Sequence, residues 1–458
     1  MTAPEVPGHW SAAQLARAQA LLPFERLSAG LLAPRPQFYG LRPAKDALAH
    51  ELGEQALLEW WMAALGRPGA WRARWCPLRP MLSHAESLGW PIQVYSPGRE
   101  VDVPALHAVG GPDQPAARHR CRSMALIRVP DAVVYSKSNL VRAGDVALLD
   151  HQGDELARMP CHLSTDGGVL AQRGDEVALA EQDGLPELPR ALSLLGLHSF
   201  AYGHWLEEFL PKLGACLTEP GVERLTVLVD AQMPTQLFES LALVLGGMDR
   251  VRIVQPGEAL KIRELWAVTA PLYYPIGPAP GTLGSAGWHV MDGPWMATCM
   301  QRLSARWAHA VPVSTLERVY LGRTDGQHRR LLNRPDVEAW FRGQGFSIVD
   351  AHDVPFLQQM ALMRGAKWLA APEGSALSNS LFAPAGTRIG MLAGPQVMHM
   401  EAYAQVVQAQ GQHLCLCLGR QPQALRPGEY FGNYTTDLDT LPQLLDRLER
   451  DAAQAGGG

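Results

Sequence analysis

Arginine residues gather in one short stretch of the chain, directly after an apolar run at 318–322 that is typical of a buried strand. The arginines are Arg323, Arg329, Arg330 and Arg334, and Asn333 lies beside Arg334. In open α/β sheets, ligands bind outside the carboxyl ends of the strands. A guanidinium group stays charged and can donate two parallel hydrogen bonds to the oxygens of one phosphate. The stretch therefore indicates phosphate binding. A solvated basic loop with surface ion pairs is the alternative.

A second segment that could bind a ligand is a loop of small residues after a later apolar run at 367–371. It reads Glu373-Gly374-Ser375-Ala376-Leu377-Ser378-Asn379. Small residues let the backbone approach a ligand, and a helix N-terminus offers N–H groups to an anion. The segment differs from GxxxxGK[ST] and GxGxxG, which disfavours a P-loop kinase or a NAD enzyme. An ordinary strand-to-helix turn capped by Ser375 is the alternative.

A third group combines an imidazole with carboxylates. If His204 begins a helix, Glu207 and Glu208 follow three and four residues later, on much the same face. An imidazole beside a carboxylate is the arrangement that general base catalysis requires. The alternative is a helix start that carries two solvated glutamates.

Alternating strand and helix patterns must position these groups. In residues 311–430 we expect a parallel sheet with right-handed crossovers, because five apolar runs alternate with helix-length segments. The expected strands are 318–322, 346–349, 367–371, 388–392 and 413–418, and the helices are 335–344, 355–365, one opening near Ser375, and 399–410. Upstream, we expect helices at 204–216, 235–245 and 295–309 and strands at 225–229, 251–254 and 265–268.

We expect four regions along the chain. Residues 1–100 would form a helical cap, and residues 101–310 an α/β domain that starts with β-hairpins. Residues 311–430 would form a Rossmann-like domain, and residues 431–458 a helix at about 438–452, folded back on the first domain, with a disordered tail from Ala452. The Pro/Gly-rich segment Pro271–Gly287 reads as a loop or lid.

Composition excludes several classes of protein. The chain has 458 residues and a net charge of −5, which does not indicate a general nucleic-acid or membrane binder. Its seven cysteines include no CxxC pair, which favours reduced thiols. We expect no signal peptide and no membrane-spanning segment. These features predict a cytoplasmic protein.

Three blocks in this order resemble glycosyltransferase family 61. Residues 201–211, AYGHWLEEFLP, are similar to the family's N-Y-G-H-W-L-x-D-x-L-P block. Gly322-Arg323 and Arg329-Arg330-Leu331-Leu332-Asn333-Arg334 are similar to its Ser-Arg and Arg-Arg-x-x-Asn-Glu, followed by Phe356 and Gln359 on the next helix. The Glu373–Asn379 segment is similar to its H-G-A-x-L-x-N. The resemblance covers roughly residues 100–420.

The resemblance implies a GT-B fold, in which two Rossmann-like domains face a cleft. It implies a bacterial-type glycosyltransferase of surface polysaccharide (capsule) synthesis that uses a nucleotide-sugar donor and inverts the anomeric carbon without a metal or other cofactor. The transferred group would be a hexose or pentose. The acceptor would be a growing glycan, which could be lipid-linked at the inner face of the membrane. The donor, the linkage and the oligomeric state are not specified by the sequence.

The resemblance also assigns roles to residues. His204 or Glu208 would take the proton of the acceptor hydroxyl. Donor binding would involve Arg323, Arg329, Arg330, Asn333, Gln359, Glu373, Gly374, Ser375, Ala376 and Asn379. The arginines and backbone N–H groups would neutralise charge on the leaving diphosphate.

Departures from the family pattern indicate a divergent member. Glu373 stands where the family has histidine, and it places a carboxylate near the expected diphosphate. Glu208 replaces an aspartate, Gly322 a serine and Arg334 a glutamate. Two alternatives therefore stay open. One is a non-catalytic binding or scaffold protein on the same fold, and the other is a sugar-nucleotide epimerase-like enzyme.

Overall fold

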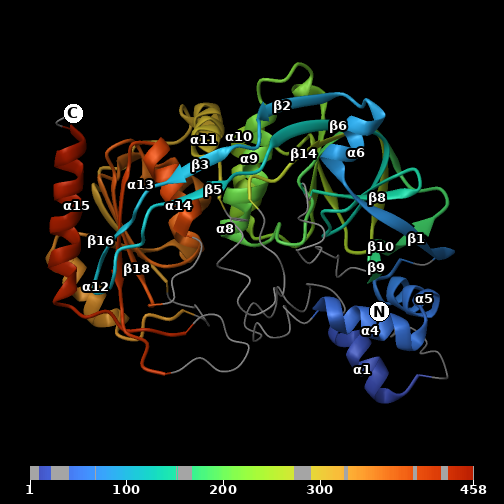
Figure 1. Cartoon of the computed structure of the whole chain (residues 1–458), viewed down its shortest axis with the longest axis horizontal. Coiled ribbons are helices and arrows are strands. Elements are labelled where there is room, and N and C mark those ends of the chain that lie inside the picture. The colour runs from blue at the N-terminus through green and yellow to red at the C-terminus, as the bar shows by residue number, and fades with distance from the viewer. Residues whose placement is uncertain are drawn as a thin grey trace.

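The structure of the chain is a computed structural model. It describes residues 10–21, 41–67, 69–150, 152, 168–272, 290–323, 329–395, 400–423 and 432–456. Most of the loop expected at Pro271–Gly287, and residues 324–328 of the arginine stretch, lie outside the described residues. The protein contains two main sheets, and helices pack between them (Figure 1).

The second sheet confirms the five strands expected in residues 311–430. Its order is β16 (Ser347–Asp350), β15 (Arg318–Gly322), β17 (Trp368–Pro372), β18 (Arg388–Ala393), β19 (His413–Leu418) and β4 (His107–Val109). All neighbouring strands are parallel. Counted along the chain, the first five strands are arranged 2-1-3-4-5, one of the common orders of doubly wound sheets. The strand order reverses between β15 and β17, so a ligand crevice is expected there.

Helices follow these strands as the periodicity indicates. They are α12 (Arg334–Gly343), α13 (Phe356–Gly365), the 3₁₀ helix η4 (Ser375–Phe382), α14 (Met400–Ala409) and α15 (Thr440–Gly456). Two expectations about the C-terminus were wrong. Helix α15 continues through Ala452 to Gly456, so those residues are helical. It packs on β18 and β19 of the second sheet through Leu441, Leu444 and Leu448 rather than on the first domain.

The first sheet is larger than expected because its parallel and antiparallel parts are continuous. Its order is β13 (Val251–Val254), β12 (Thr226–Asp230), β11 (Glu187–Ser193), β14 (Ala259–Val268), β6 (Met124–Tyr135), β7 (Val141–Ala143), β8 (Val146–Leu149), β1 (Trp71–Pro80), β10 (Glu176–Gln182) and β9 (Val169–Arg173), with β2 (Ile92–Ser96) on β6. The four strands from β13 to β14 are parallel, in chain order 3-2-1-4. Helix α10 (Thr235–Leu245) connects β12 to β13.

The N-terminal segment is helical only in part. Helices α1 (Ala12–Leu21), α4 (Leu41–Leu52) and α5 (Glu54–Ala64) pack around Trp60 and Trp61 against the β9–β10 end of the first sheet. Residues 71–80, which we placed in the helical cap, instead form the long strand β1, followed by α6 (Met81–Leu88). The alternation of Arg72 and Arg74 with the apolar residues Trp71, Ala73 and Trp75 is the strand pattern that we missed.

Two connections tie the sheets together. Strands β3 (Glu100–Val103) and β5 (Ala117–Arg120) pair with each other and run from the first sheet toward the second, where β4 adds to the edge (Figure 1). Helix α11 (Gly293–Trp307) packs on helices of both halves. Its Trp307 contacts Phe356 and Phe382 of the second half, with ring centroids 5.8 and 5.2 Å apart. One hydrophobic cluster therefore extends through both halves. We call the first sheet with its helices the N-terminal lobe and the second the C-terminal lobe.

Candidate active site

The helix that follows β11 carries the first group of candidate residues. It consists of α8 (Tyr202–His204), a π-helical turn (Trp205–Phe209) and α9 (Leu210–Cys216). A π turn adds a residue to the helical turn, and such turns are frequent at functional sites. Glu207 and Glu208 are only 4% and 2% exposed, so they are not the solvated glutamates of the alternative interpretation.

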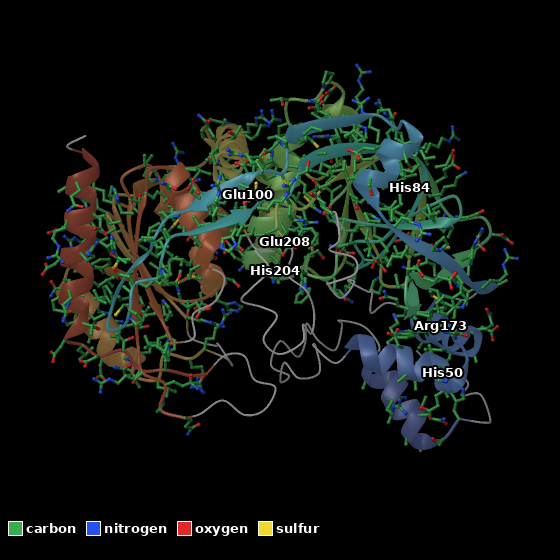
Figure 2. All side chains as sticks on the ribbon, in the orientation of Figure 1. His50, His84, Glu100, Arg173, His204 and Glu208 are labelled. Atoms are coloured by element: carbon green, nitrogen blue, oxygen red, sulfur yellow. The ribbon has the colours of Figure 1, made fainter. Side chains whose placement is uncertain are left out.

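His204 and Glu208 form a pair. Nδ1 of His204 is hydrogen-bonded to Oε1 of Glu208, and the exposed fractions of the two side chains are 27% and 3%. The ring of His198 stacks on the ring of His204 with centroids 4.3 Å apart. Figure 2 places both members of the pair on the central helix between the two sheets. A carboxylate on Nδ1 fixes the ring and its tautomer, so that Nε2 is the atom suited to accept a proton.

Buried charges lie behind this pair. Lys212, one helical turn after Glu208, is 7% exposed, and burial lowers the pKa of its ammonium group. The charges of Asp150 and Glu208 act in the opposite direction on that pKa. Asp150 pairs with Arg122 at 3.6 Å. The Glu208 side chain therefore lies next to a buried network that contains Lys212 and the Asp150–Arg122 ion pair.

The loop before the helix is held by Asp230 at the end of β12. Its carboxylate accepts hydrogen bonds from the backbone N–H groups of Lys137 (2.6 Å) and Gly196 (3.0 Å) and from the Ser199 hydroxyl (2.7 Å). Asp230 is completely buried. Neither Asp230 nor His198 was singled out from the sequence. An aspartate that ends an apolar strand was the available signal.

The second group of candidate residues lies at the reversal of strand order in the C-terminal lobe. Arg323 follows β15, and its Nη1 donates to the carbonyl oxygen of Glu373, which follows β17, at 3.1 Å. A Cβ atom on Gly374 would lie 3.0 Å from the same Nη1, so a larger residue would displace the guanidinium group. The arginine and the small-residue loop are therefore packed against each other at the crevice where ligands of such sheets bind.

Arg329 reaches the same loop by an ion pair. Its Nη1 lies 2.8 Å from Oε1 of Glu373, and the side chains are 17% and 8% exposed. The backbone of Arg329 is in the left-handed region, with φ of 56°, which is uncommon for residues other than glycine. Glu373 thus has a cationic partner within the protein. The Arg329 charge offsets the negative charge that the Glu373 carboxylate places near the expected diphosphate.

The other arginine-stretch residues have different surroundings. Arg330 is exposed, and its backbone N–H and carbonyl bond to Asn433 and Tyr434. The Asn333 amide donates to the Thr436 carbonyl and accepts from the Thr436 N–H. Arg334 lies 3.7 Å from Glu338 on its own helix. Asn333 therefore fastens the segment near Thr436.

The two lobes meet at these groups. The Tyr202 hydroxyl lies 2.6 Å from Oδ1 of Asn379 and 3.0 Å from Oε1 of Gln359. The Asn379 amide also donates to Gln359, and the Gln359 amide donates to the Ala351 and Val354 carbonyls. Asn379 and Gln359 are 0% and 2% exposed. The side chains of Asn379 and Gln359 thus form hydrogen bonds within the protein, and those to Tyr202 join the His204 helix to η4 and α13.

Close packing completes this contact. A Cβ atom on Gly203 would lie 3.2 Å from Oγ of Ser375 and 3.3 Å from Oγ of Ser378, tighter than usual contacts. The residue before His204 therefore touches the start of η4, and Ser375 gives no side-chain cap to that helix. The His204 helix, through Gly203, and the side chains of Arg323 and Arg329 therefore contact the same Glu373–Asn379 segment.

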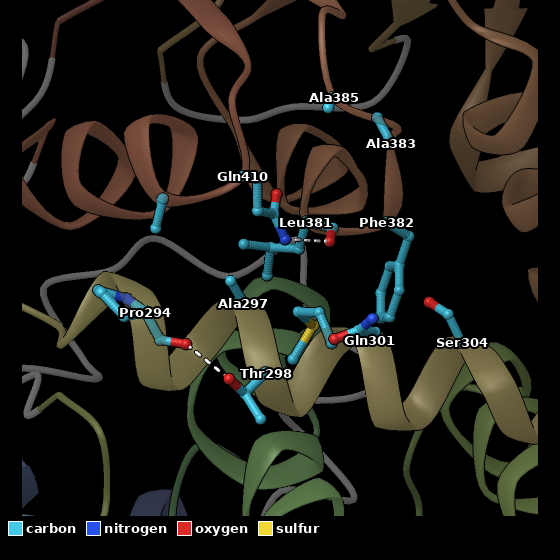
Figure 3. A pocket seen from close by; sticks show the side chains of 12 residues that line it. Pro294, Ala297, Thr298, Gln301, Ser304, Leu381, Phe382, Ala383, Ala385 and Gln410 are labelled. Carbon is cyan, nitrogen blue, oxygen red and sulfur yellow. Dashed lines mark hydrogen bonds between the residues drawn. The ribbon is translucent and has the colours of Figure 1, made fainter.

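A separate groove lies between α11, the far end of η4 and α14 (Figure 3). Its volume is about 520 Å³, and none of its twelve lining residues is charged. They include Thr298, Gln301, Phe382 and Gln410, and none of the predicted site residues is among them. Among the described residues, no group of three or more His, Cys, Asp or Glu side chains could hold a metal ion. Likewise, no described helix combines the length and apolar character needed to cross a membrane.

The chain is a two-lobed α/β protein with a His204–Glu208 pair on one lobe and arginines at the strand switch of the other. Residues 202–390 match the model of the family Glycosyltransferase 61, and this part of the chain is a glycosyltransferase 61 domain. The match begins at Tyr202 and includes both groups of candidate residues. No curated protein matches the chain. Family membership of this domain implies sugar transfer.

Proposed function

We propose that the protein is an inverting glycosyltransferase that uses a nucleotide sugar and needs no metal ion. Its two lobes would form a GT-B arrangement, with the acceptor on the N-terminal lobe and the donor on the C-terminal lobe. One observation carries the proposal. Arg323 and Arg329 converge on the loop at the strand switch, and that loop contacts the residue before His204.

The proposed reaction is a single displacement. Nε2 of His204 accepts the proton of the acceptor hydroxyl, while Glu208 stabilises the imidazolium ion that forms. The acceptor oxygen bonds to the anomeric carbon as the bond from that carbon to the donor phosphate breaks. Negative charge then builds on the leaving diphosphate, where Arg323, Arg329 and the backbone N–H groups after Gly374 stabilise it.

Location and pathway are part of the proposal. We place the enzyme in the cytoplasm, working at the inner face of the membrane on a glycan acceptor of surface polysaccharide synthesis. The six cysteines in the described residues are buried and form no disulfide, and this supports a reducing compartment. Cell fractionation tests the assignment. Recovery of the protein in the periplasmic, outer-membrane or extracellular fraction would contradict it.

The experiment for the reaction uses intact protein and a panel of nucleoside diphosphates and their sugar conjugates. We expect binding of at least one member by calorimetry. Arg323→Ala should weaken it by about 1.5–3 kcal/mol, the scale of a hydrogen bond to a charged group. Arg224→Ala is the matched control, because that side chain is 78% exposed and pairs with Glu223 on the surface. No binding at millimolar concentration, or equal affinity in Arg323→Ala and parent, would reject the proposal.

A non-catalytic binding protein is the second candidate, and the Glu373–Arg329 ion pair favours it. A pair that stayed closed would keep one cation away from the leaving group. Transfer or hydrolysis of a bound donor that disappears in folded Arg323→Ala would exclude this candidate. Analysis of the products separates transfer from epimerisation, because an epimerase leaves the nucleotide attached to the sugar.

A further inference from the structure

Glu207 is a buried carboxylate that the proposed reaction does not use. It lies in the π-helical turn beside Glu208, and only 4% of the residue is exposed. Burial raises the pKa of its carboxyl group. A buried carboxylate is costly unless it is hydrogen-bonded, so its partners indicate why it is accommodated.

The partners of Glu207 come from the other lobe. Oε1 of Glu207 accepts hydrogen bonds from the Ser378 hydroxyl on η4 and from the Tyr403 hydroxyl on α14, each at 2.6 Å. The two hydroxyl oxygens lie 3.1 Å apart, which closes a triangle. Both donors belong to helices of the C-terminal lobe, and Ser378 is part of the Glu373–Asn379 loop segment. Glu207 therefore connects the His204 helix directly to the donor side of the site.

The π-helical turn gives neighbouring glutamates different tasks. Glu208 bonds to His204 within the helix, whereas Glu207 bonds across the lobe interface. Gly203 makes the other close contact with Ser375 and Ser378. Gly203, one residue before His204, and Glu207, three residues after it, thus both contact η4. The position of the His204 ring relative to the donor loop follows from these two contacts.

We propose that Glu207 is a positioning residue that holds the His204–Glu208 pair in register with the donor loop through Ser378 and Tyr403. The inference rests on the proposed sugar transfer. Its effect is on geometry, because Glu207 is placed to touch neither the reacting atoms nor the diphosphate. Displacement of a catalytic group by about 1 Å can cost a factor of about 100 in rate.

The test compares Glu207→Leu, Glu207→Gln and Tyr403→Phe with the parent, using the donor that the panel identifies. Leucine removes the acceptor oxygen, so turnover should fall by about 10–100-fold while affinity for the nucleoside diphosphate changes by less than about threefold. Glutamine keeps an oxygen acceptor and should restore turnover to within about threefold of the parent. Tyr403→Phe removes only one hydrogen bond and should lose about 3–10-fold. Glu223→Leu is the surface control, since Glu223 is 64% exposed.

The outcomes separate this inference from the proposed function. A parent protein that transfers sugar, with a Glu207→Leu variant that turns over equally fast, rejects the positioning role alone. Equal loss of donor affinity and turnover in the leucine variant also rejects it, because a general structural defect would produce that result. If Glu207→Leu does not fold, the turnover and nucleoside diphosphate affinity of Tyr403→Phe are compared with those of the parent instead. Equal turnover in Tyr403→Phe and parent then rejects the positioning role. A parent with no activity on any donor rejects the proposed function, and the positioning role with it.

Discussion

The Glu373 carboxylate lies 2.8 Å from the Arg329 guanidinium group, at the carboxyl end of the third strand of the parallel sheet. Arg323 binds the backbone carbonyl of the same glutamate. One of the two guanidinium charges at the strand switch is therefore neutralised by a carboxylate. A diphosphate that binds here competes with Glu373 for Arg329.

This competition predicts the effect of Glu373→Gln. The variant removes a negative charge but keeps an oxygen that can accept from Arg329, so a nucleoside diphosphate should bind more tightly by about 1–2 kcal/mol. Calorimetry with the best nucleoside diphosphate of the panel measures this change. Affinity equal to the parent would show that the pair does not compete, and weaker binding would show that Glu373 itself contacts the ligand.

The proposed roles of His204 and Glu208 predict turnover losses without losses of donor affinity. His204→Ala should lower turnover by ~10²–10⁴-fold, and Glu208→Gln should lower it by a smaller factor in the same range, because the imidazole stays in place. His50→Ala on the exposed face of α4 is the control. Initial rates at saturating donor, with the dissociation constant of the nucleoside diphosphate, provide the comparison. Full turnover in both variants would remove this pair from the mechanism.

The lobe contact at Gly203 predicts a steric effect. In Gly203→Ala the added Cβ would approach Ser375 to 3.2 Å, so the two lobes must separate slightly or strain must build. We expect unfolding free energy to fall by about 1–3 kcal/mol, as for other additions to a packed interior. Urea unfolding measures the loss, and the second substitution Ser375→Gly should restore part of it. A Gly203→Ala protein as stable as the parent would contradict the contact.

The burial of Glu207 predicts a pH dependence of stability. Because the folded-state pKa is raised, its stabilising contribution is fully present below the unfolded pKa and is lost as pH rises through the folded pKa. The groups that act on this carboxyl are Ser378, Tyr403, His204 and Glu208. Urea unfolding between about pH 4 and pH 8 should show parent stability falling relative to Glu207→Gln as pH rises. A constant difference between the two proteins would contradict this prediction.

The local elements of the C-terminal lobe could be predicted because each has its own signal. Strand β17 is entirely buried and reads as an apolar run, and Pro335 lies in the first turn of α12, where proline is favoured. The arginine stretch, the small-residue loop and the His204 block were likewise visible as short motifs. The rule that ligands bind at the carboxyl ends of parallel strands pointed to the arginine stretch, and the family resemblance grouped it with the other two motifs.

The parts that could not be predicted depend on contacts between distant residues. Strand β4 has three residues and no pattern of its own, and it joins the second sheet only by pairing with β19. Glu207 finds partners 171 and 196 residues away. The Asn333 amide fastens the backbone of Thr436, 103 residues away. Local sequence does not encode which distant group will satisfy a buried polar atom.

The most direct measurement is a crystal structure of the intact protein soaked with the nucleoside diphosphate that binds best. The account predicts phosphate oxygens within hydrogen-bond distance of the Arg323 and Arg329 guanidinium groups, with Glu373 displaced from Arg329 and His204 facing the same cavity. Phosphates bound elsewhere, or both guanidinium groups directed away from the crevice between the lobes, would contradict it.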